Sequence, residues 1–477
     1  MSAQPNQIQV QVNASTSPDR KRPHPTLQSG KRWSKYNLLF KSKRNGYLLY
    51  NALSNHLAAL DQDIADLLID VSKGVRSFDP AKNFPLYVQL LLAKVLVDDI
   101  EEDNHLESIH HQRNIANYDT SNLMLTIAPT LGCNFDCPYC FEKNKRGIHM
   151  RESVEKKVID WIAAHANLRY ISITWYGGEP LLRFNTMVAL SEKIESLGIP
   201  FFASVITNGY LITEDIARKL TSLKIKTVQI TLDGDQHTHD QRRTLVSGRE
   251  TYTRILESIQ YLIDNWDGRI IIRQNIDREN RDSYSHLHAE LVKRFPTDRL
   301  SIYASLVRSA AGELPDLACQ MDRKEMEEFR LENHEQHGIS PGNTFPDHDL
   351  GGCTATRQNG FVIGPKGELY KCWMDLGVKE MEVGHVDGGL PLKQNIVAQY
   401  TTGSDNFSDP ECRRCFFLPI CSGGCAQLRV ENKYYDAKHD TCFRFKDTLP
   451  EILEIHYENK SVGVKKKPSN EFINVTL

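Results

Sequence analysis

The chain has 477 residues, of which 40% are hydrophobic and 25% charged. At about 150 residues per domain, this length allows roughly three domains with buried cores. The 58 basic and 61 acidic residues leave a formal net charge of −3, so we expect no nucleic-acid binding and no disordered acidic tail. No apolar run reaches the ~20 residues that cross a bilayer, and residues 1–30 are polar and lack the apolar region of a secretory signal. We therefore expect a cytoplasmic protein without membrane contact, whose residues 1–30 form a disordered tail.

Residues 33–110 are expected to form a small module that begins with a β-hairpin. Two apolar runs flank the dipeptide Asn45-Gly46, which is typical of tight hairpin turns. The runs are residues 37–40 and 47–50.

Helices are expected to follow the hairpin. Asp61 precedes apolar residues at helical spacing, and this helix should stop near Gly74. A second apolar helix is predicted over residues 84–97. The polar stretch 101–120 is then expected to be a linker, and its histidines to be solvated and not metal ligands. These histidines are His105, His110 and His111.

From residue 123 onward, short β-rich runs alternate with amphipathic helical stretches. The expected strands are residues 123–128, 170–176, 201–206, 227–232, 270–276 and 300–306. Six βα repeats imply a parallel sheet, and six are too few for a closed eight-stranded barrel. We therefore expect an α/β fold with a partial (β/α)6 barrel over residues 120–320, whose active site lies on the loops after the strands.

Less regular structure is expected beyond the barrel. A charged, solvated helix and a loop should occupy residues 321–352. A cysteine-rich domain should span residues 353–445, with a helix and a tail over residues 446–477.

The cysteines point to bound metal. There are eleven of them, an odd number, and all lie beyond residue 132 in tight groups. Because the cytosol keeps thiols reduced, grouped cysteines in a long chain without a signal peptide more often bind metal than form disulfides.

The first group follows the first barrel strand directly. Cys133, Cys137 and Cys140 form a C-x3-C-x2-C loop. Three thiolates suit a 4Fe-4S cluster that leaves one iron open to another ligand. A structural zinc ion needs a fourth protein ligand, for which His149 is close enough, so zinc stays an alternative.

The second barrel strand ends in Gly177-Gly178-Glu179. Glycines let the backbone approach a ligand closely, and a carboxylate can hold an ammonium group. The alternative is a tight turn between the strand and the next helix.

Together these motifs resemble those of radical S-adenosylmethionine enzymes. The cysteine triplet matches that family's cluster motif, and Gly177-Gly178-Glu179 matches its methionine-binding motif. The resemblance implies that the open iron chelates S-adenosylmethionine, that Glu179 holds its amino group, and that electron transfer yields a 5′-deoxyadenosyl radical. Further implied cofactor contacts are Tyr139, Asn208 after Thr207, Thr231, and Arg243, which would reach the cofactor's carboxylate. For Thr231 and Arg243, ordinary hydrogen bonding at strand ends is the alternative.

Seven later cysteines resemble the SPASM extension of the same family, and the resemblance implies two auxiliary 4Fe-4S clusters, three clusters in all. The first would be bound by Cys353, Cys372 and Cys425, and the second by Cys412, Cys415, Cys421 and Cys442. A zinc ribbon is the alternative for this tandem spacing. Sulfatase-maturing relatives carry an extra cysteine that residues 354–371 lack, so the first auxiliary cluster has an open iron, a noncysteine ligand or Cys319 as its fourth partner. Cys319 otherwise matches no motif.

We interpret the chain as a maturase that abstracts a hydrogen from a ribosomally made precursor peptide. It would form a carbon–carbon cyclophane or a thioether cross-link, with an external electron donor such as flavodoxin or ferredoxin. By the same resemblance, residues 33–110 would form a winged-helix-like module that binds the precursor's leader by strand addition. A sulfatase-type protein maturase and a zinc-binding peptide-recognition module are the alternatives. Asp375 and Asp233 are candidate catalytic carboxylates.

Overall fold

The structure is a computed structural model that describes residues 30–463, except residues 141, 143–146, 308–318, 343–344, 349–352 and 389–392. The tails expected before residue 30 and after residue 463 lie outside the described residues. No helix in the described part combines the length and the apolar character that crossing a membrane requires.

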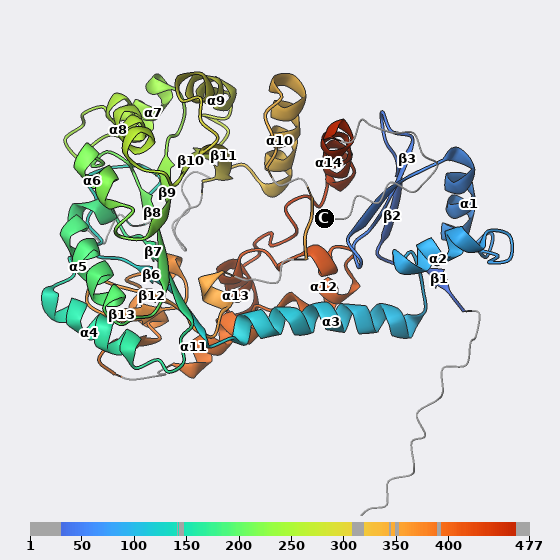
Figure 1. Cartoon of the computed structure of the whole chain (residues 1–477), viewed down its shortest axis with the longest axis horizontal. Helices are drawn as coiled ribbons and strands as arrows, with labels where there is room; N and C mark the ends of the chain where they lie inside the picture. The colour runs from blue at the N-terminus through green and yellow to red at the C-terminus, as the bar shows by residue number, and fades with distance from the viewer. Residues whose placement is uncertain are drawn as a thin grey trace, which may run out of the picture.

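A nine-stranded, mostly parallel sheet forms the centre of the fold (Figure 1). Its strands run in the order β11-β10-β9-β8-β7-β6-β12-β13-β14, so six consecutive parallel strands lie side by side in chain order. These six are β6 (Asn122–Ile127), β7 (Tyr170–Trp175), β8 (Phe201–Thr207), β9 (Ile225–Thr231), β10 (Arg269–Ile276) and β11 (Leu300–Leu306). This confirms the six expected βα repeats. The sheet does not close on itself, because β11 and β14 are its two edges.

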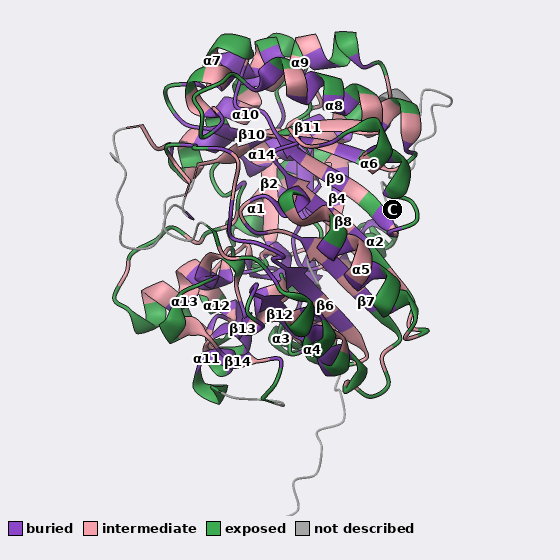
Figure 2. Cartoon of the chain, turned by 90° about the vertical axis from the view of Figure 1, so that its left-hand side faces the viewer, coloured by how far each residue is buried: buried purple, intermediate pink, exposed green. Residues whose placement is uncertain are grey.

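Helices between these strands cover the outer face of the sheet. They are α4 (Glu152–Ala163), α5 (Phe184–Glu195), α6 (Glu214–Lys219), α7 (Gln236–Arg242), α8 (Tyr252–Asn265) and α9 (Ser283–Arg294). Alternate residues of β7 are buried, and the helices pack apolar side chains such as Val158 and Ile259 onto the same core (Figure 2). A parallel sheet covered in this way leaves polar side chains at the carboxyl ends of its strands, where the loops begin.

The amino-terminal module contains a three-stranded antiparallel sheet of β2 (Asn37–Lys41), β3 (Tyr47–Asn51) and β4 (His56–Leu60). The predicted hairpin is confirmed: Lys41 pairs with Tyr47, and Gly46 at the turn has a φ of 70°. α1 (Gln62–Ser72) ends before Gly74 as expected. The helix predicted over residues 84–97 is too long, because α2 (Phe84–Leu92) ends where Lys94 adopts a φ of 57°. β5 (Leu96–Val97) then pairs with β1 (Arg32–Trp33).

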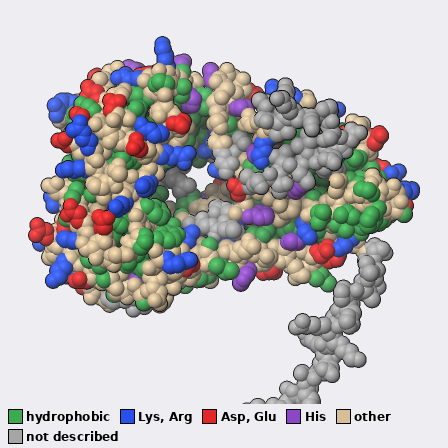
Figure 3. Space-filling view, in the orientation of Figure 1, with side chains coloured by type: hydrophobic (Ala, Val, Ile, Leu, Met, Phe, Trp, Pro, Cys, Tyr) green, Lys and Arg blue, Asp and Glu red, His purple; other side chains and the backbone are tan. Residues whose placement is uncertain are grey.

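The linker expected over residues 101–120 is wrong, because α3 (Asp99–Tyr118) is a continuous helix. Asp98 and Glu101 form a capping box at its start. Its buried face includes the polar residues Arg113 and Asn117, so the apolar periodicity of a core-facing helix is incomplete. The helix spans the distance between the amino-terminal module and the barrel, and the molecule is hollowed between them (Figure 3).

Two of the α3 histidines, His110 and His111, differ in their exposure to solvent. The ring of His110 stacks on Phe407, with centroids 4.4 Å apart, and its Nε2 lies 3.0 Å from a carboxylate oxygen of Asp405. The prediction that His110 is solvated is therefore wrong, because α3 packs it against the cysteine-rich region. His111 is exposed, as expected.

The cysteine-rich region contains more regular structure than expected. β12 (Gly360–Ile363) pairs with β6 in parallel, and β13 (Glu368–Tyr370) and β14 (Gly384–His385) extend the same sheet. The sheet therefore continues past the boundary predicted at residue 320. The remaining helices are α10 (Arg323–His337), α11 (Gln394–Ala398), α12 (Pro410–Arg414), α13 (Ala426–Tyr434) and α14 (Leu449–Gly463). α10 forms as predicted but buries Met326 and Phe329, so it is not fully solvated.

The amino-terminal sheet shares a hydrophobic core with the end of the chain. Leu48 and Tyr50 pack in one cluster with Phe407, Leu449 and Leu453. The amino-terminal module therefore packs against both the cysteine-rich region and helix α14.

Candidate functional site

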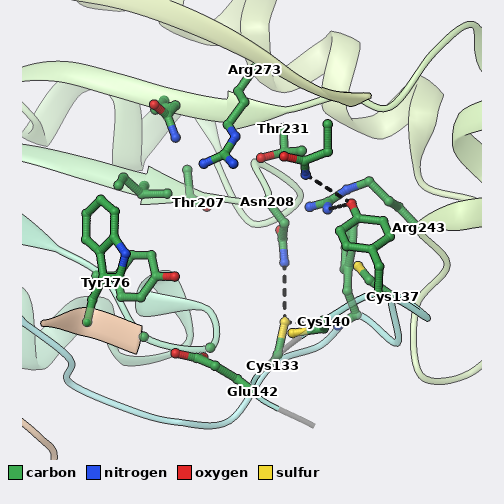
Figure 4. Close-up of a pocket in the computed structure, with 18 of the residues that line it drawn as sticks. Cys133, Cys137, Cys140, Glu142, Tyr176, Thr207, Asn208, Thr231, Arg243 and Arg273 are labelled. Atoms are coloured by element: carbon green, nitrogen blue, oxygen red, sulfur yellow. Dashed lines mark hydrogen bonds between the residues drawn. The ribbon is translucent and has the colours of Figure 1, made fainter. Parts of the chain in front are cut away.

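A cavity of about 480 Å³ opens at the carboxyl ends of the parallel strands (Figure 4). Its walls bring together most of the residues singled out in the barrel sequence: Cys133, Cys137, Cys140, Tyr139, Gly177, Gly178, Thr207, Asn208, Thr231 and Arg243. Sites of this size suit small ligands such as nucleotides and cofactors.

The three-cysteine loop follows β6 and is held from two sides. The backbone N–H of Phe135 donates to the Sγ of Cys133 at 3.4 Å. The side-chain amide of Asn208, after β8, lies 3.9 Å from the same sulfur and donates to Asn134 Oδ1 at 2.8 Å. Burial raises the pKa of the Cys133 thiol to about 12. A buried thiol of this kind deprotonates only when a cation, such as a metal, stabilises its anion.

His149, the possible zinc ligand, is engaged elsewhere. Its Nδ1 lies 2.7 Å from the hydroxyl of Thr130, and it does not line the cavity.

The glycine turn after β7 lies directly against the segment that leads from β6 into the cysteine loop. A Cβ on Gly177, whose φ is +123°, would meet the carbonyl oxygen of Thr130 at 2.2 Å. A Cβ on Gly178 would meet that of Gly132 at 2.3 Å. The backbone N–H of Glu179 donates to the same Gly132 carbonyl at 2.8 Å. Only glycines allow this approach, so the turn fixes the backbone just before Cys133.

Glu179 is fully buried behind the wall of the cavity and is not itself a lining residue. Its carboxylate accepts hydrogen bonds from the hydroxyl of Thr207 and the backbone N–H of Asn208, both at 2.7 Å. It also accepts one from the N–H of Leu181 at 3.0 Å. Glu179 therefore ties the end of β7 to the end of β8 and positions two residues that do line the cavity.

A second buried carboxylate, Asp233, organises the opposite wall. It accepts hydrogen bonds from the hydroxyl of Tyr139 and, at 3.2 Å, from the backbone N–H of Asn275. Nη1 of Arg243 donates to the Tyr139 oxygen at 2.6 Å and lies 4.0 Å from Asp233. Burial holds the pKa of Tyr139 well above its usual range, so the phenol keeps its proton. Asp233 does not line the cavity.

A second cavity of about 820 Å³ lies among the later cysteines. Five of them line it: Cys353, Cys372, Cys421, Cys425 and Cys442. The thiols fall into two neighbourhoods. Burial, with a further contribution from nearby Cys425, raises the pKa values of Cys353 and Cys372.

In the second neighbourhood, burial again is the largest cause that raises the pKa of Cys421, and Cys412 and Cys415 contribute. Lys446 connects Cys442 to this group. Its Nζ donates to the Cys442 sulfur at 3.4 Å, and Cys442 and Cys415 both raise its pKa.

Two other candidates line neither cavity. Asp375 is buried and accepts a hydrogen bond from the hydroxyl of Tyr400 at 2.7 Å. Cys319 lies near the loop after β10, where its carbonyl accepts from the N–H of Arg278 at 2.8 Å. In the described part of the chain, no three His, Cys, Asp or Glu side chains meet at the spacing of a single-ion site.

Sequence reasoning did not single out several residues of the first cavity. Arg273 on β10, Tyr303 on β11 and Trp373 after Cys372 all line it. Arg273 and Asn275 lie two residues apart in the polar run Arg273-Gln274-Asn275 of the otherwise isoleucine-rich strand β10. Polar residues two apart at the carboxyl end of a buried strand are a signal that could have found them.

Known proteins provide three comparisons with this chain. The model of the Radical SAM superfamily matches residues 127–284. The cysteine-type anaerobic sulfatase-maturating enzyme of Clostridium perfringens is 30% identical over 379 residues, which cover 70% of this chain and 98% of that enzyme. The radical SAM cyclopropyl synthase TigE of Paramaledivibacter caminithermalis is 23% identical over 447 residues, or 84% of this chain and 90% of the synthase.

The fold has a counterpart among solved structures. Native anSMEcpe with bound AdoMet and Cp18Cys peptide superimposes with a TM-score of 0.54 at 20% sequence identity, over 71% of this chain and 99% of that one. The likeness concerns the fold, in which a mostly parallel sheet carries the site.

Proposed function

Because the chain belongs to the radical S-adenosylmethionine superfamily, we propose that it is a maturase of a ribosomally made precursor peptide. It would abstract a hydrogen from an unactivated carbon and form one intramolecular cross-link, a carbon–carbon cyclophane or a thioether. The observation that carries the proposal is the meeting of three cysteines, two glycines without room for side chains, and Arg243 around a single cavity.

The residues present fit the cofactors of the superfamily. Cys133, Cys137 and Cys140 would hold a 4Fe-4S cluster. Gly177 and Gly178 line the same cavity, in which S-adenosylmethionine would lie beside the cluster. When bound, these groups supply a 5′-deoxyadenosyl radical, and the two auxiliary clusters supply an electron acceptor.

The chain's own side chains would orient the cofactor and keep water out. Arg243 is held by Tyr139 and Asp233 so that its guanidinium faces the cavity, where it would bind the cofactor's carboxylate. Asn208 and Thr231 would contribute hydrogen bonds from the neighbouring strands. Glu179, which we expected to hold the amino group, would also act by positioning Asn208.

The auxiliary clusters are supported by the two neighbourhoods of thiols. We assign the first cluster to Cys353, Cys372 and Cys425, and the second to Cys412, Cys415, Cys421 and Cys442. Cys319 is a poor fourth ligand for the first cluster, because it does not line the cavity that contains the other three thiols.

A peptide substrate is supported by the relatives. A sulfatase-maturating enzyme is 30% identical, and a protein of the same fold was solved with a bound peptide. We propose that the β2-β3-β4 sheet, in which β2 and β4 are the outer strands among the residues that the structure describes, belongs to a winged-helix-like module that binds the leader by strand addition. The external electron donor would be a flavodoxin or ferredoxin.

Mass spectrometry of a coexpressed precursor tests the proposal. We expect a loss of two hydrogens that fragmentation confines to one pair of residues. The matched control is the triple variant Cys133→Ala, Cys137→Ala, Cys140→Ala, which should leave the peptide unmodified and produce no 5′-deoxyadenosine. Product formation by this variant would refute the assignment. So would an unmodified precursor with an intact leader, if the coexpressed wild-type enzyme forms 5′-deoxyadenosine.

A sulfatase-type protein maturase is the second candidate, favoured by the 30% identical relative. That reaction oxidises one side chain of a protein and forms no cross-link. Presenting the holoenzyme with a sulfatase-derived peptide therefore separates the two: an oxidation that fragmentation confines to a single residue, without a link to a second residue, would support the second candidate.

A further inference from the structure

The cavity contains two guanidinium groups whose surroundings differ. Arg243 donates to Tyr139 and lies close to Asp233. The side chain of Arg273, on β10, forms no hydrogen bond or ion pair with any residue that the structure describes, and its Nε atom is buried without a partner. Figure 4 shows this side chain reaching from its strand into the cavity. One of the two cations thus lacks a counter-charge from the protein.

Two other arginines of the barrel are neutralised. Arg242 pairs with Asp277 at 2.5 Å, and Arg278 pairs with Glu325 at 2.8 Å. Among the described residues that line the cavity, Glu142 is the single carboxylate, and it lies on the opposite side from Arg273 (Figure 4). A partly desolvated cation without a partner is costly, so its retention here indicates that a ligand brings the negative charge.

The neighbours of Arg273 in the sheet are uncharged and differ in this from the cysteines on the other side of the cavity. Arg273 lies level with Thr231 on β9 and Tyr303 on β11. The hydroxyl of Tyr303 donates to Gln229 at 3.1 Å. This side of the cavity is therefore formed by aromatic and uncharged polar groups, as in a surface that contacts a peptide.

We propose that Arg273 binds the carboxylate of an aspartate or glutamate side chain in the peptide substrate. This inference rests on the proposed function. S-adenosylmethionine carries one carboxylate, and Arg243 is the group assigned to it, so the second guanidinium is available to the substrate. Because Nε is the atom without a partner, the carboxylate would meet the Nε and Nη edge through two parallel hydrogen bonds. A lysine offers no such planar pair of donors.

Affinity selection on anaerobic holoenzyme tests the proposal with two pools of synthetic heptapeptides. One pool has Asp or Glu at its central position and the other has Asn or Gln. The remaining positions are randomised among uncharged residues, and the ends are acetylated and amidated. We expect wild-type enzyme to retain the acidic pool about tenfold more than the amide pool, the scale of one charge-assisted pair. Arg273→Gln should retain both pools equally, and Arg273→Lys should fall between.

Arg278→Gln is the matched control, since Arg278 is exposed and neither it nor its partner Glu325 lines the cavity. It should keep the wild-type preference. Equal retention of the two pools by wild-type enzyme, or an unchanged preference in Arg273→Gln, would overturn the proposal.

A second measurement tests whether Arg273 binds the carboxylate of S-adenosylmethionine and not one of the substrate. We expect Arg273→Gln to bind S-adenosylmethionine and its decarboxylated analogue with wild-type affinities in calorimetry. If the variant instead binds S-adenosylmethionine as weakly as wild-type enzyme binds the analogue, Arg273 belongs to the cofactor and the inference is wrong. Failure of the proposed function is detected separately, as absence of 5′-deoxyadenosine from the wild-type holoenzyme.

Discussion

The indole of Trp373 stacks on the phenol of Tyr176, with ring centroids 5.2 Å apart and ring planes at 20°. Tyr176 directly follows β7, and Trp373 directly follows Cys372, so this pair joins the barrel to the cysteine-rich region. Trp373 and its neighbour Met374 line both cavities. The stacked pair therefore belongs to the wall that separates the three-cysteine site from the proposed first auxiliary cluster.

We expect Trp373→Ala to lower the yield of modified peptide per 5′-deoxyadenosine by about two- to tenfold, the value of one aromatic pair. Loss of the indole would open the wall without touching the three-cysteine loop, so cofactor cleavage without substrate should persist. Trp373→Phe keeps a stackable ring and should recover most of the yield. Parallel quantification of both products by mass spectrometry checks this, and an unchanged ratio in Trp373→Ala would count against a role for the wall.

Arg113 connects α3 to the loop that carries the second group of cysteines. Its guanidinium donates to Asn406 Oδ1 at 2.8 Å and to the carbonyl oxygen of Cys421 at 3.0 Å, and it lies over the ring of Phe407. We expect Arg113→Gln to lower the free energy of unfolding by about 1–3 kcal/mol, because buried acceptors lose a charged donor. Iron content should fall as the Cys421 loop loosens.

Arg413→Gln provides the control for Arg113, since it breaks the exposed pair with Glu107, 2.8 Å long, between the same two parts of the chain. Exposed pairs contribute about 0–1 kcal/mol. Chemical denaturation and iron analysis of both variants decide the matter. Equal losses in the two variants would mean that Arg113 has no special role in positioning Cys421.

The pH dependence of stability should contain a contribution from His239, which is fully buried beneath Asp233. Its Nδ1 accepts the backbone N–H of Asp233 at 3.2 Å, and its Nε2 donates to the hydroxyl of Thr251, which itself donates to the carbonyl of Arg243. Burial and the charge of Arg243 hold the pKa of His239 well below its usual range. The ring is therefore neutral in the folded protein, with the ring of Tyr252 packed beside it.

Since an unfolded histidine titrates near pH 6.5, the unfolded chain takes up the proton first as the pH falls. This contribution to stability is complete above about pH 6.5 and declines below it, by up to about 1.4 kcal/mol per pH unit. We expect His239→Gln to remove this part of the dependence, whereas His237→Gln, at an exposed position of the same helix, keeps it. Urea unfolding of the apoprotein between pH 5 and 7.5 measures the difference; identical profiles for wild type and His239→Gln would contradict the expectation.

The barrel could be predicted from the sequence because its signals are local. Each parallel strand is a short apolar run, and the expected boundaries lie within two residues of the observed ones. α3 could not be predicted in this way. Part of its buried face is polar, and Arg113 finds its partners at Asn406 and Cys421, which are remote in sequence. β12 offers four residues with no local sign that they pair with β6.

In the candidate site, too, some residues could be predicted from local sequence and others could not. The cysteine triplet and the glycine turn are recognisable because their chemistry depends on sequence spacing. The role of Glu179 as a buried support, and the place of Arg273 in the cavity wall, depend on which strands are neighbours and in what register. That information arises only when β7 meets β8 and β10 meets β9 and β11.

The last prediction concerns the contact between the glycine turn and the cysteine loop. A Cβ on Gly178 would lie 2.3 Å from the carbonyl oxygen of Gly132 and 2.7 Å from that of Leu131, and both are backbone atoms that cannot turn aside. We expect Gly178→Ala to lower the free energy of unfolding by about 1–3 kcal/mol, as overpacking does. It should also reduce cluster occupancy and 5′-deoxyadenosine formation, because the displaced segment leads directly into Cys133. Gly30→Ala, with nothing within 4 Å of its added Cβ, is the control and should match wild type. Thermal unfolding of the apoprotein and iron content of the reconstituted enzyme test the two effects separately. Wild-type values for Gly178→Ala in both would show that the turn does not constrain the cysteine loop.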